Sequence, residues 1–194
     1  IERKSKLGGP IHNKGVLILT GFLSNVFARR MTLSFSARLV MEQTYQMVEG
    51  DSASLAELCA LLSALGDAPL KQGIAVTGSV NQYGQVQAVG GINEKVEGFY
   101  DVCSVNELSG SQGVILPASN VRNLMIREDV RDAVEKGEFH IWPVSRVEEA
   151  VELLTGTDAG EADSSGRYTN GVFGRIEETL DEFQEIVRKA GIRQ

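Results

Sequence analysis

The first fifty residues contain two segments rich in apolar side chains. Residues 15–23 (GVLILTGFL) are almost continuously apolar behind a glycine, which is typical of a short buried strand. Residues 33–44 (LSFSARLVMEQT) alternate in part between apolar and polar side chains, which favours a second strand with one exposed face. The pattern therefore predicts that the chain opens with two strands.

A helix is expected after a break in this pattern at residues 48–51 (VEGD). Within residues 52–65 (SASLAELCALLSAL), leucines recur at helical spacing, so one face of a helix is apolar. Asp51 is suited to the N-cap of this helix and Gly66 to its C′ position, the residue just beyond the C-cap. Ser52 is therefore expected at a junction between a strand and a helix.

The middle of the chain alternates between strand and helix patterns. Residues 73–80 and 84–90 flank an Asn-Gln-Tyr-Gly turn and predict a β-hairpin, and helical spacing resumes after Gly90 and Gly91. Further on, the pattern predicts a strand at 113–117, a helix at 129–136, a strand at 139–144 and a helix at 145–154. Ser145 and Glu148 have the spacing of a capping box for the last of these helices. This order of elements predicts an α/β (α+β) fold.

The C-terminal region changes in composition. Residues 155–174 are rich in Gly, Ser, Asp and Thr, which is typical of a flexible linker. Beyond them, apolar residues spaced four, three and four apart predict an amphipathic helix, which could pack on its own domain or on a neighbouring subunit. We therefore expect a main domain at 1–156, a linker at 157–174 and a C-terminal helix at 175–194.

Composition narrows the possible functions. A formal net charge of −7 argues against a general nucleic-acid or anionic-membrane binder, because either partner would repel the average surface. No apolar run reaches the length of a membrane span, and two cysteines form neither a disulfide framework nor a metal site. We expect buried free thiols, no metal, and a cytoplasmic protein. The chain begins at Ile1 without an initiator methionine, which suggests a piece of a longer protein.

Ser52 and Lys95 are the candidate catalytic residues, although each also has an ordinary structural explanation. Ser52 could simply cap a helix, and it does not complete the G-x-S-x-G elbow because Ser54 replaces the second glycine. The two histidines, His12 and His140, are better explained as structural residues, so a serine nucleophile would need another base. A lysine can fill that role once desolvation favours its neutral form. Lys95 follows Gly90-Gly91 on an expected apolar helix face, where a surface lysine is also plausible.

Four segments, in this order and spacing, resemble the peptidase domain of Lon proteases, particularly the archaeal-type LonB branch: GGPIHNKGVLILTGFL, VEGDSAS, AVTGSV and AVGGINEK. The resemblance covers residues 8–156 and implies a Lon peptidase fold, which is ribosomal-protein S5 domain 2-like, here with an extra C-terminal helix. It implies that Ser52 is the nucleophile and that Lys95 is its partner. It also implies that Thr77 orients the lysine ammonium, although a β-branched strand residue is the alternative.

The implied reaction is acyl transfer on peptide bonds of unfolded or damaged proteins, with Lys95 accepting and returning the Ser52 proton. The resemblance further implies a homo-hexamer and coupling to an AAA+ ATPase module. No phosphate-binding loop motif occurs in this sequence, so ATP and Mg are expected only for an upstream module, and no cofactor is expected in this domain. A catalytically silent, Lon-like scaffold is the alternative.

This chain departs from bacterial Lon segments, which carry a proline before the nucleophile where this chain has Asp51. A carboxylate near Lys95 would favour the charged lysine, which cannot accept a proton. We therefore hypothesise a self-inhibited arrangement in which Asp51 or Glu49 bridges Lys95.

Overall fold

Two small sheets lie at the centre of the fold in the computed structural model, which describes residues 9–28, 33–40 and 49–191. The larger sheet is parallel, with strand order β1-β4-β5, and the smaller is an antiparallel pair of β2 and β3. The strands are β1 (Ile74–Val76), β2 (Ser79–Val80), β3 (Val86–Gln87), β4 (Gly113–Pro117) and β5 (His140–Val144). The α/β prediction is therefore confirmed.

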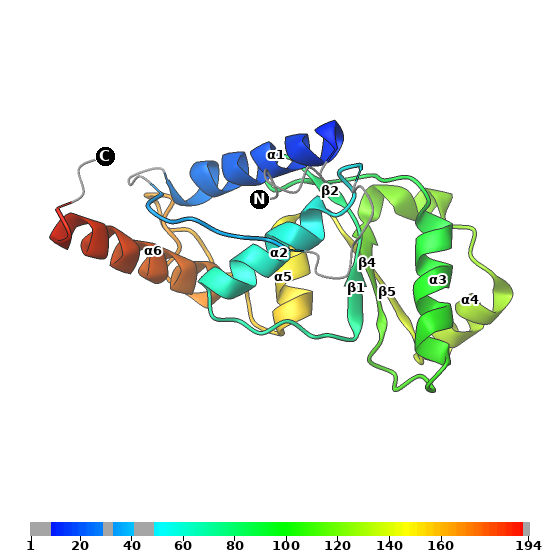
Figure 1. The fold of residues 1–194 in the computed structure, drawn as a ribbon. Helices are drawn as coiled ribbons and strands as arrows, with labels where there is room; N and C mark the ends of the chain where they lie inside the picture. Colours follow the sequence, from blue (N-terminus) through cyan, green and yellow to red (C-terminus); the bar gives the residue numbers. More distant parts are fainter. Residues whose placement is uncertain (1–8, 29–32, 41–48, 192–194) are drawn as a thin grey trace.

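Strand β4 separates two hydrophobic cores because its side chains alternate between the faces of the sheet. Ile115 belongs to the larger core, whereas Val114 and Leu116 belong to the smaller one. Figure 1 shows α2 and α5 on one side of the sheet and α3 and α4 on the other. Their bounds are α2 (Ser54–Leu65), α3 (Ile92–Ser104), α4 (Glu128–Glu135) and α5 (Val147–Thr155). A short 3₁₀ helix, η1 (Ala118–Asn123), follows β4.

The N-terminal strand predicted at residues 15–23 is wrong, because these residues lie within the helix α1 (Pro10–Phe27). The buried positions Val16, Leu19, Leu23 and Phe27 are three or four residues apart, while Leu17 is 68% exposed. A strand would have buried alternate residues instead. An apolar run of this length is ambiguous by itself, and the helical period is visible only over the whole segment.

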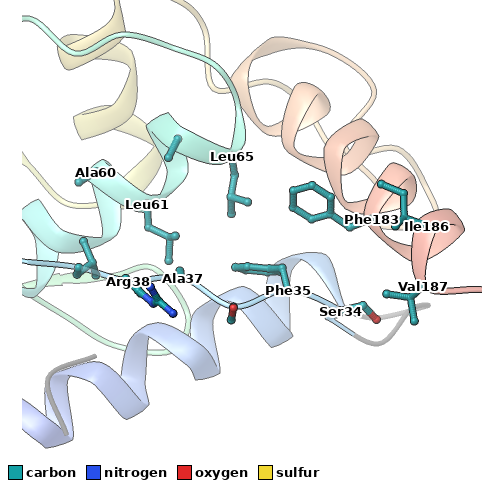
Figure 2. Close-up of a pocket in the computed structure, with 13 residues that line it drawn as sticks. Ser34, Phe35, Ala37, Arg38, Ala60, Leu61, Leu65, Phe183, Ile186 and Val187 are labelled. Atoms are coloured by element: carbon teal, nitrogen blue, oxygen red, sulfur yellow. The ribbon is translucent and has the colours of Figure 1, made fainter. Parts of the chain in front are cut away.

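The second predicted strand, at 33–44, is not found over its described part. Residues 33–40 form neither helix nor strand, and residues 41–44 lie outside the described residues. Phe35 faces Phe183 of α6 (Gly171–Lys189), with ring centroids 6.3 Å apart. This segment, α2 and α6 enclose an apolar cavity of about 440 Å³, into which Phe35, Leu65 and Phe183 point (Figure 2).

The predicted β-hairpin is only partly correct. Residues 79–80 pair antiparallel with residues 86–87, as expected, but residues 74–76 pair with β4 in the parallel sheet. The chain changes sheets at Thr77 and Gly78. Alternation of apolar residues predicts a strand but not its partner, which explains this error.

Helix α6 packs on its own domain and begins earlier than predicted. Val172, Phe173 and Ile176 are fully buried in the larger core, and the rings of Phe173 and Phe27 meet edge to face. Between α5 and α6 an isolated β-bridge joins Ala162 to Tyr168. The linker and the domain boundary assigned there stay predictions.

Three predicted helix caps are wrong. The N-cap position of α2 is Ala53 rather than Asp51, and Gly66 occupies the C-cap itself without a left-handed conformation. Arg146 takes the N-cap position of α5, and the backbone N–H of Ser145 donates to Glu149 rather than to Glu148. The cap residues deviate by one or two positions, as is usual for helix ends.

Candidate functional site

The loop that carries Ser52 is fastened to the chain just beyond β1. The backbone N–H of Gly78 donates to the carbonyl oxygen of Ser52 at 2.9 Å, and the Gly78 carbonyl accepts from the N–H of Leu55 at 3.1 Å. Gly50 has φ +102°, a conformation that residues with side chains rarely adopt, so the tight bend before Ser52 favours glycine. The bend and the two hydrogen bonds hold Ser52 at the start of α2.

Thr77 links Lys95 to the Ser52 loop. The Lys95 Nζ donates to Thr77 Oγ1 at 3.3 Å, and Thr77 Oγ1 donates to the Ser52 carbonyl oxygen at 3.4 Å. Lys95 lies in the first turn of α3, where its backbone N–H donates to the carbonyl of Gly91, and Thr77 is buried. Three of the predicted site residues, from three separate segments, are thus neighbours.

The contact between Ser52 and Lys95 is indirect in this structure. Within residues 9–28, 33–40 and 49–191, no hydrogen bond joins the Ser52 hydroxyl to the Lys95 amine. Both side chains are half-buried, so a substrate or a solvent molecule could reach them. Thr77 therefore provides the shared contact between them.

Asp51 and Glu49 lie close by but do not bridge Lys95. The Asp51 carboxylate accepts from the Ser79 hydroxyl at 3.1 Å, and the Glu49 carboxylate accepts from the backbone N–H of Ile11 at 3.1 Å. Among the described residues, no ion pair of Lys95 with either carboxylate is formed. The hypothesised self-inhibited bridge is not the arrangement seen here.

Helix α1 lies directly over this loop. A methyl group at Gly15 would stand 3.7 Å from the Ser54 Cβ and 3.9 Å from the Asp51 Cβ. A methyl group at Gly9 would overlap the Glu49 carboxylate, which sits at the N-terminal end of α1. A carboxylate is favourable there because the helix end carries partial positive charge and free N–H groups. Glu49 therefore joins α1 to the Ser52 loop.

Two serines that the sequence analysis did not single out as site residues shape the loop. The buried Ser54 hydroxyl donates to the Asp51 carbonyl at 2.8 Å and accepts from the backbone N–H of Val80 at 3.2 Å. Ser79, also buried, holds the Asp51 side chain. The contacts from Ser54 to Val80 and from Ser79 to Asp51 have no local sequence signal, because their partners are 26 and 28 residues away in the chain.

The two histidines make structural contacts away from Lys95. His12 Nδ1 lies 3.6 Å from Oε1 of the buried Glu57, so this pair connects α1 to α2. Burial raises the pKa of the Glu57 carboxyl, and attraction to His12 partly opposes that rise. His140 hydrogen-bonds to the Gly110 carbonyl at 2.9 Å and stacks on Trp142. These contacts match the structural roles expected from the sequence.

The two cysteines are not among the residues of the candidate site. Cys59 is buried, which raises the pKa of its thiol to about 12, and Cys103 is half-buried; both are free. None of the five predicted site residues lines the apolar cavity of Figure 2.

Of the helices in the described ranges, none combines the length and apolarity that a bilayer crossing requires.

Comparison with known proteins finds consistent similarity. The profile of a family described as the Lon protease (S16) C-terminal proteolytic domain matches residues 45–156, which include Glu49, Asp51, Ser52, Thr77 and Lys95. The chain is 53% identical over 154 residues to the "Putative Lon protease homolog" of Escherichia coli (strain K12), covering 79% of this chain and 26% of that protein.

Two further relatives extend this similarity. The homolog of the same name from Haemophilus influenzae is 50% identical over 158 residues, covering 81% of this chain and 26% of that protein. The Archaeal Lon protease of Pyrococcus abyssi is 33% identical over 155 residues, covering 72% of this chain and 14% of that protein. The chain thus spans about a quarter, or less, of the length of these relatives.

Proposed function

Because the chain belongs to the Lon protease (S16) family through its C-terminal proteolytic domain, we propose that it is a serine endopeptidase with Ser52 as nucleophile and Lys95 as general base. The contact from Lys95 through Thr77 to the Ser52 backbone carries this proposal. It connects an amine, a hydroxyl and the candidate nucleophile across 43 residues of sequence. No other group of described residues combines a serine with a lysine in this way.

The mechanism is acyl transfer. Neutral Lys95 accepts the proton of the Ser52 hydroxyl as that oxygen attacks the peptide carbonyl, and then delivers the proton to the leaving amine. A water molecule activated by the same amine then hydrolyses the acyl-enzyme. Since the Ser52 and Lys95 side chains are not directly hydrogen-bonded here, their side chains must rotate toward each other before the transfer.

Backbone N–H groups near Asp51 and Ser52 stabilise the negative oxygen that develops during the attack. The N–H groups of Ser54 and Leu55 are already used, by the Asp51 and Gly78 carbonyls. We therefore assign the oxyanion role to N–H groups nearer Ser52 than these two. Each such donor contributes on the order of 3 kcal/mol in well-studied sites.

The natural substrates are proposed to be unfolded or damaged proteins, and the assembly a homo-hexamer coupled to an AAA+ module elsewhere in the full protein. ATP and Mg act only in that module. These features are proposed from membership of the family. The chain itself covers only a part of the length of its relatives. A cytoplasmic location stays a prediction.

A serine-directed test addresses the dyad itself. The chain is incubated with a fluorogenic peptide, which needs no unfolding, and with a fluorophosphonate probe whose attachment site is found by mass spectrometry. Hydrolysis and labelling at Ser52 should occur in the wild-type chain, and both should disappear in Ser52→Ala and Lys95→Ala.

The matched controls are Ser24→Ala and Lys136→Ala, which change the same residue types at exposed positions. Both controls should keep full activity. A wild-type chain that folds but neither hydrolyses the peptide nor labels at Ser52 would establish the alternative, a catalytically silent Lon-like scaffold.

A further inference from the structure

Asn120 is a buried amide that binds a distant stretch of backbone at both of its polar atoms. Its Oδ1 accepts from the backbone N–H of Val89 at 3.0 Å, and its Nδ2 donates to the Val89 carbonyl at 2.9 Å. Asn120 lies in η1 and is only 3% exposed. An amide matched to one acceptor and one donor in this way holds the backbone much as a neighbouring strand would.

The backbone that Asn120 holds leads directly into the helix that carries Lys95. Val89 lies two residues before Gly91, the N-cap residue of α3, whose φ of +66° fixes the direction in which the helix starts. The Gly91 carbonyl then accepts from the backbone N–H of Lys95 at 3.1 Å. Only the two glycines and the first turn of α3 therefore lie between Val89, which Asn120 holds, and Lys95.

The chain following Asn120 holds the same helix at further points. The backbone N–H of Met125 donates to Asn93 Oδ1 at 2.9 Å, and that of Arg127 donates to Glu97 Oε1 at 2.9 Å. The Arg127 guanidinium also binds the Asp101 carboxylate. Residues 120–127 thus contact α3 from the turn before it to its third turn.

Strand β4 fixes the positions of both Thr77 and Asn120. The backbone N–H of Thr77 donates to the carbonyl of Ile115 in β4 at 3.0 Å. Asn120 follows three residues after the end of β4. The separation between Thr77 and Lys95 is therefore set by a short, continuous stretch from Ile115 to Asn120, which is buried at residues 115–117 and at Asn120.

We infer that Asn120 is a positioning residue that holds the start of α3 so that the Lys95 amine meets Thr77 and Ser52. This inference rests on the proposed function. Asn120 touches no reacting atom and acts only through Val89. Without its two hydrogen bonds the turn at Gly90 and Gly91 gains freedom, and the Lys95 amine spends less time at Thr77.

The discriminating variant is Asn120→Asp, because its chemistry changes with pH. The ionised carboxylate accepts from the Val89 N–H but faces the Val89 carbonyl with a second acceptor, which breaks one contact. The protonated carboxyl restores the original pattern of one donor and one acceptor. Burial raises the pKa of a carboxyl, so this restoration falls at a pH at which folded protein can be assayed.

The matched control is Asn123→Asp, which makes the same substitution three residues away at an exposed position of η1. Peptide hydrolysis is measured for wild type and both variants from about pH 8 to about pH 5, and kcat and KM are expressed as ratios to wild type at each pH. The ratio removes the part of the pH dependence that the variant and the wild type share. Unfolding in urea is followed in parallel.

We expect Asn120→Asp to lower kcat at least about tenfold at pH 8, with KM changed less than about twofold, because misplacing a catalytic group reduces the rate of chemistry. Its kcat ratio should rise several-fold toward pH 5. The Asn123→Asp ratio should stay near one throughout. Asn120→Ala, which cannot recover, should show a low ratio at every pH.

A flat kcat ratio for Asn120→Asp would overturn the inference, whether it lies near one or is lowered together with stability. The proposed function is tested separately by wild-type hydrolysis and its loss in Ser52→Ala. If the wild type is inactive, both ideas fall; if it is active and Asn120→Asp shows a flat ratio, only the role of Asn120 is wrong.

Discussion

Replacing Thr77 by valine tests the contact on which the proposed dyad depends. Valine keeps the shape and the branched Cβ of threonine but removes the hydroxyl that accepts from Lys95 and donates to the Ser52 carbonyl. Loss of the first contact frees the Lys95 amine, and loss of the second loosens the Ser52 loop. Both effects should slow proton transfer from Ser52.

The size of the effect can be estimated from the geometry. Both contacts, at 3.3 and 3.4 Å, are longer than a typical hydrogen bond, so we take the usual net value of about 1 kcal/mol between neutral groups as the upper bound for each. A total of up to about 2 kcal/mol corresponds to a fall of up to roughly 30-fold in kcat/KM.

Folding stability should change much less in Thr77→Val. The Ser52 carbonyl keeps its bond from the Gly78 N–H, and the half-buried Lys95 amine can turn toward water. Neither group is left buried without a partner, so we expect a loss of less than about 1 kcal/mol in the free energy of unfolding. Activity and stability should therefore separate.

Thr77→Ser provides the matched control because it keeps the hydroxyl and removes one buried methyl group. It should cost about 1 kcal/mol of stability, while kcat/KM stays within about threefold of wild type. Kinetics on a fluorogenic peptide and urea unfolding measure the two quantities. Equal kcat/KM for Thr77→Val and wild type, or equal losses in the two variants, would refute the role assigned to the hydroxyl.

Two further changes test the surroundings of the site. Gly9→Ala should displace the Glu49 carboxylate from the end of α1 and slow probe labelling of Ser52, as Glu49→Ala should also do; an unchanged labelling rate would contradict the coupling. Burial raises the pKa of Glu57, so its contribution to stability is present at low pH and lost as the pH rises through that raised pKa. The unfolding free energy of Glu57→Gln minus that of wild type should therefore increase between about pH 4 and pH 7 in urea titrations, and a flat difference would show that burial of this carboxyl has no such effect.

The elements with clear periodicity were predictable from the sequence, but α1 was not. The helical spacing of apolar residues correctly predicted α2 and α3, and the short continuous apolar run at 113–117 correctly predicted β4. In α1 the run at residues 15–23, with six apolar side chains among nine residues, resembles a buried strand and masks the helical period, whereas Pro10 in the first turn is a signal of a helix start. Helical spacing over 16–27 would have corrected the assignment.

The proximity of the candidate site residues was predictable only through the family resemblance. Spacing alone could not bring Ser52, Thr77 and Lys95 together, because their proximity depends on how β1 pairs with β4 and where α3 starts. Asn120 gave no signal at all, since both of its hydrogen bonds go to the backbone of a residue 31 positions away. A hydrogen bond from a side chain to a main-chain atom far away in the sequence does not constrain the neighbouring side chains, so it produces no recognisable sequence pattern.

Helix α6 extends the larger hydrophobic core beyond the residues that the family model matches. The family match ends at residue 156, yet Val172, Phe173 and Ile176 are entirely enclosed in the larger core. At about 1.5–3 kcal/mol for each enclosed side chain, these three contribute on the order of 5–9 kcal/mol, close to the whole net stability of an ordinary domain. A chain cut at residue 156 would lose these three side chains and expose to water the surface of α2 that α6 covers.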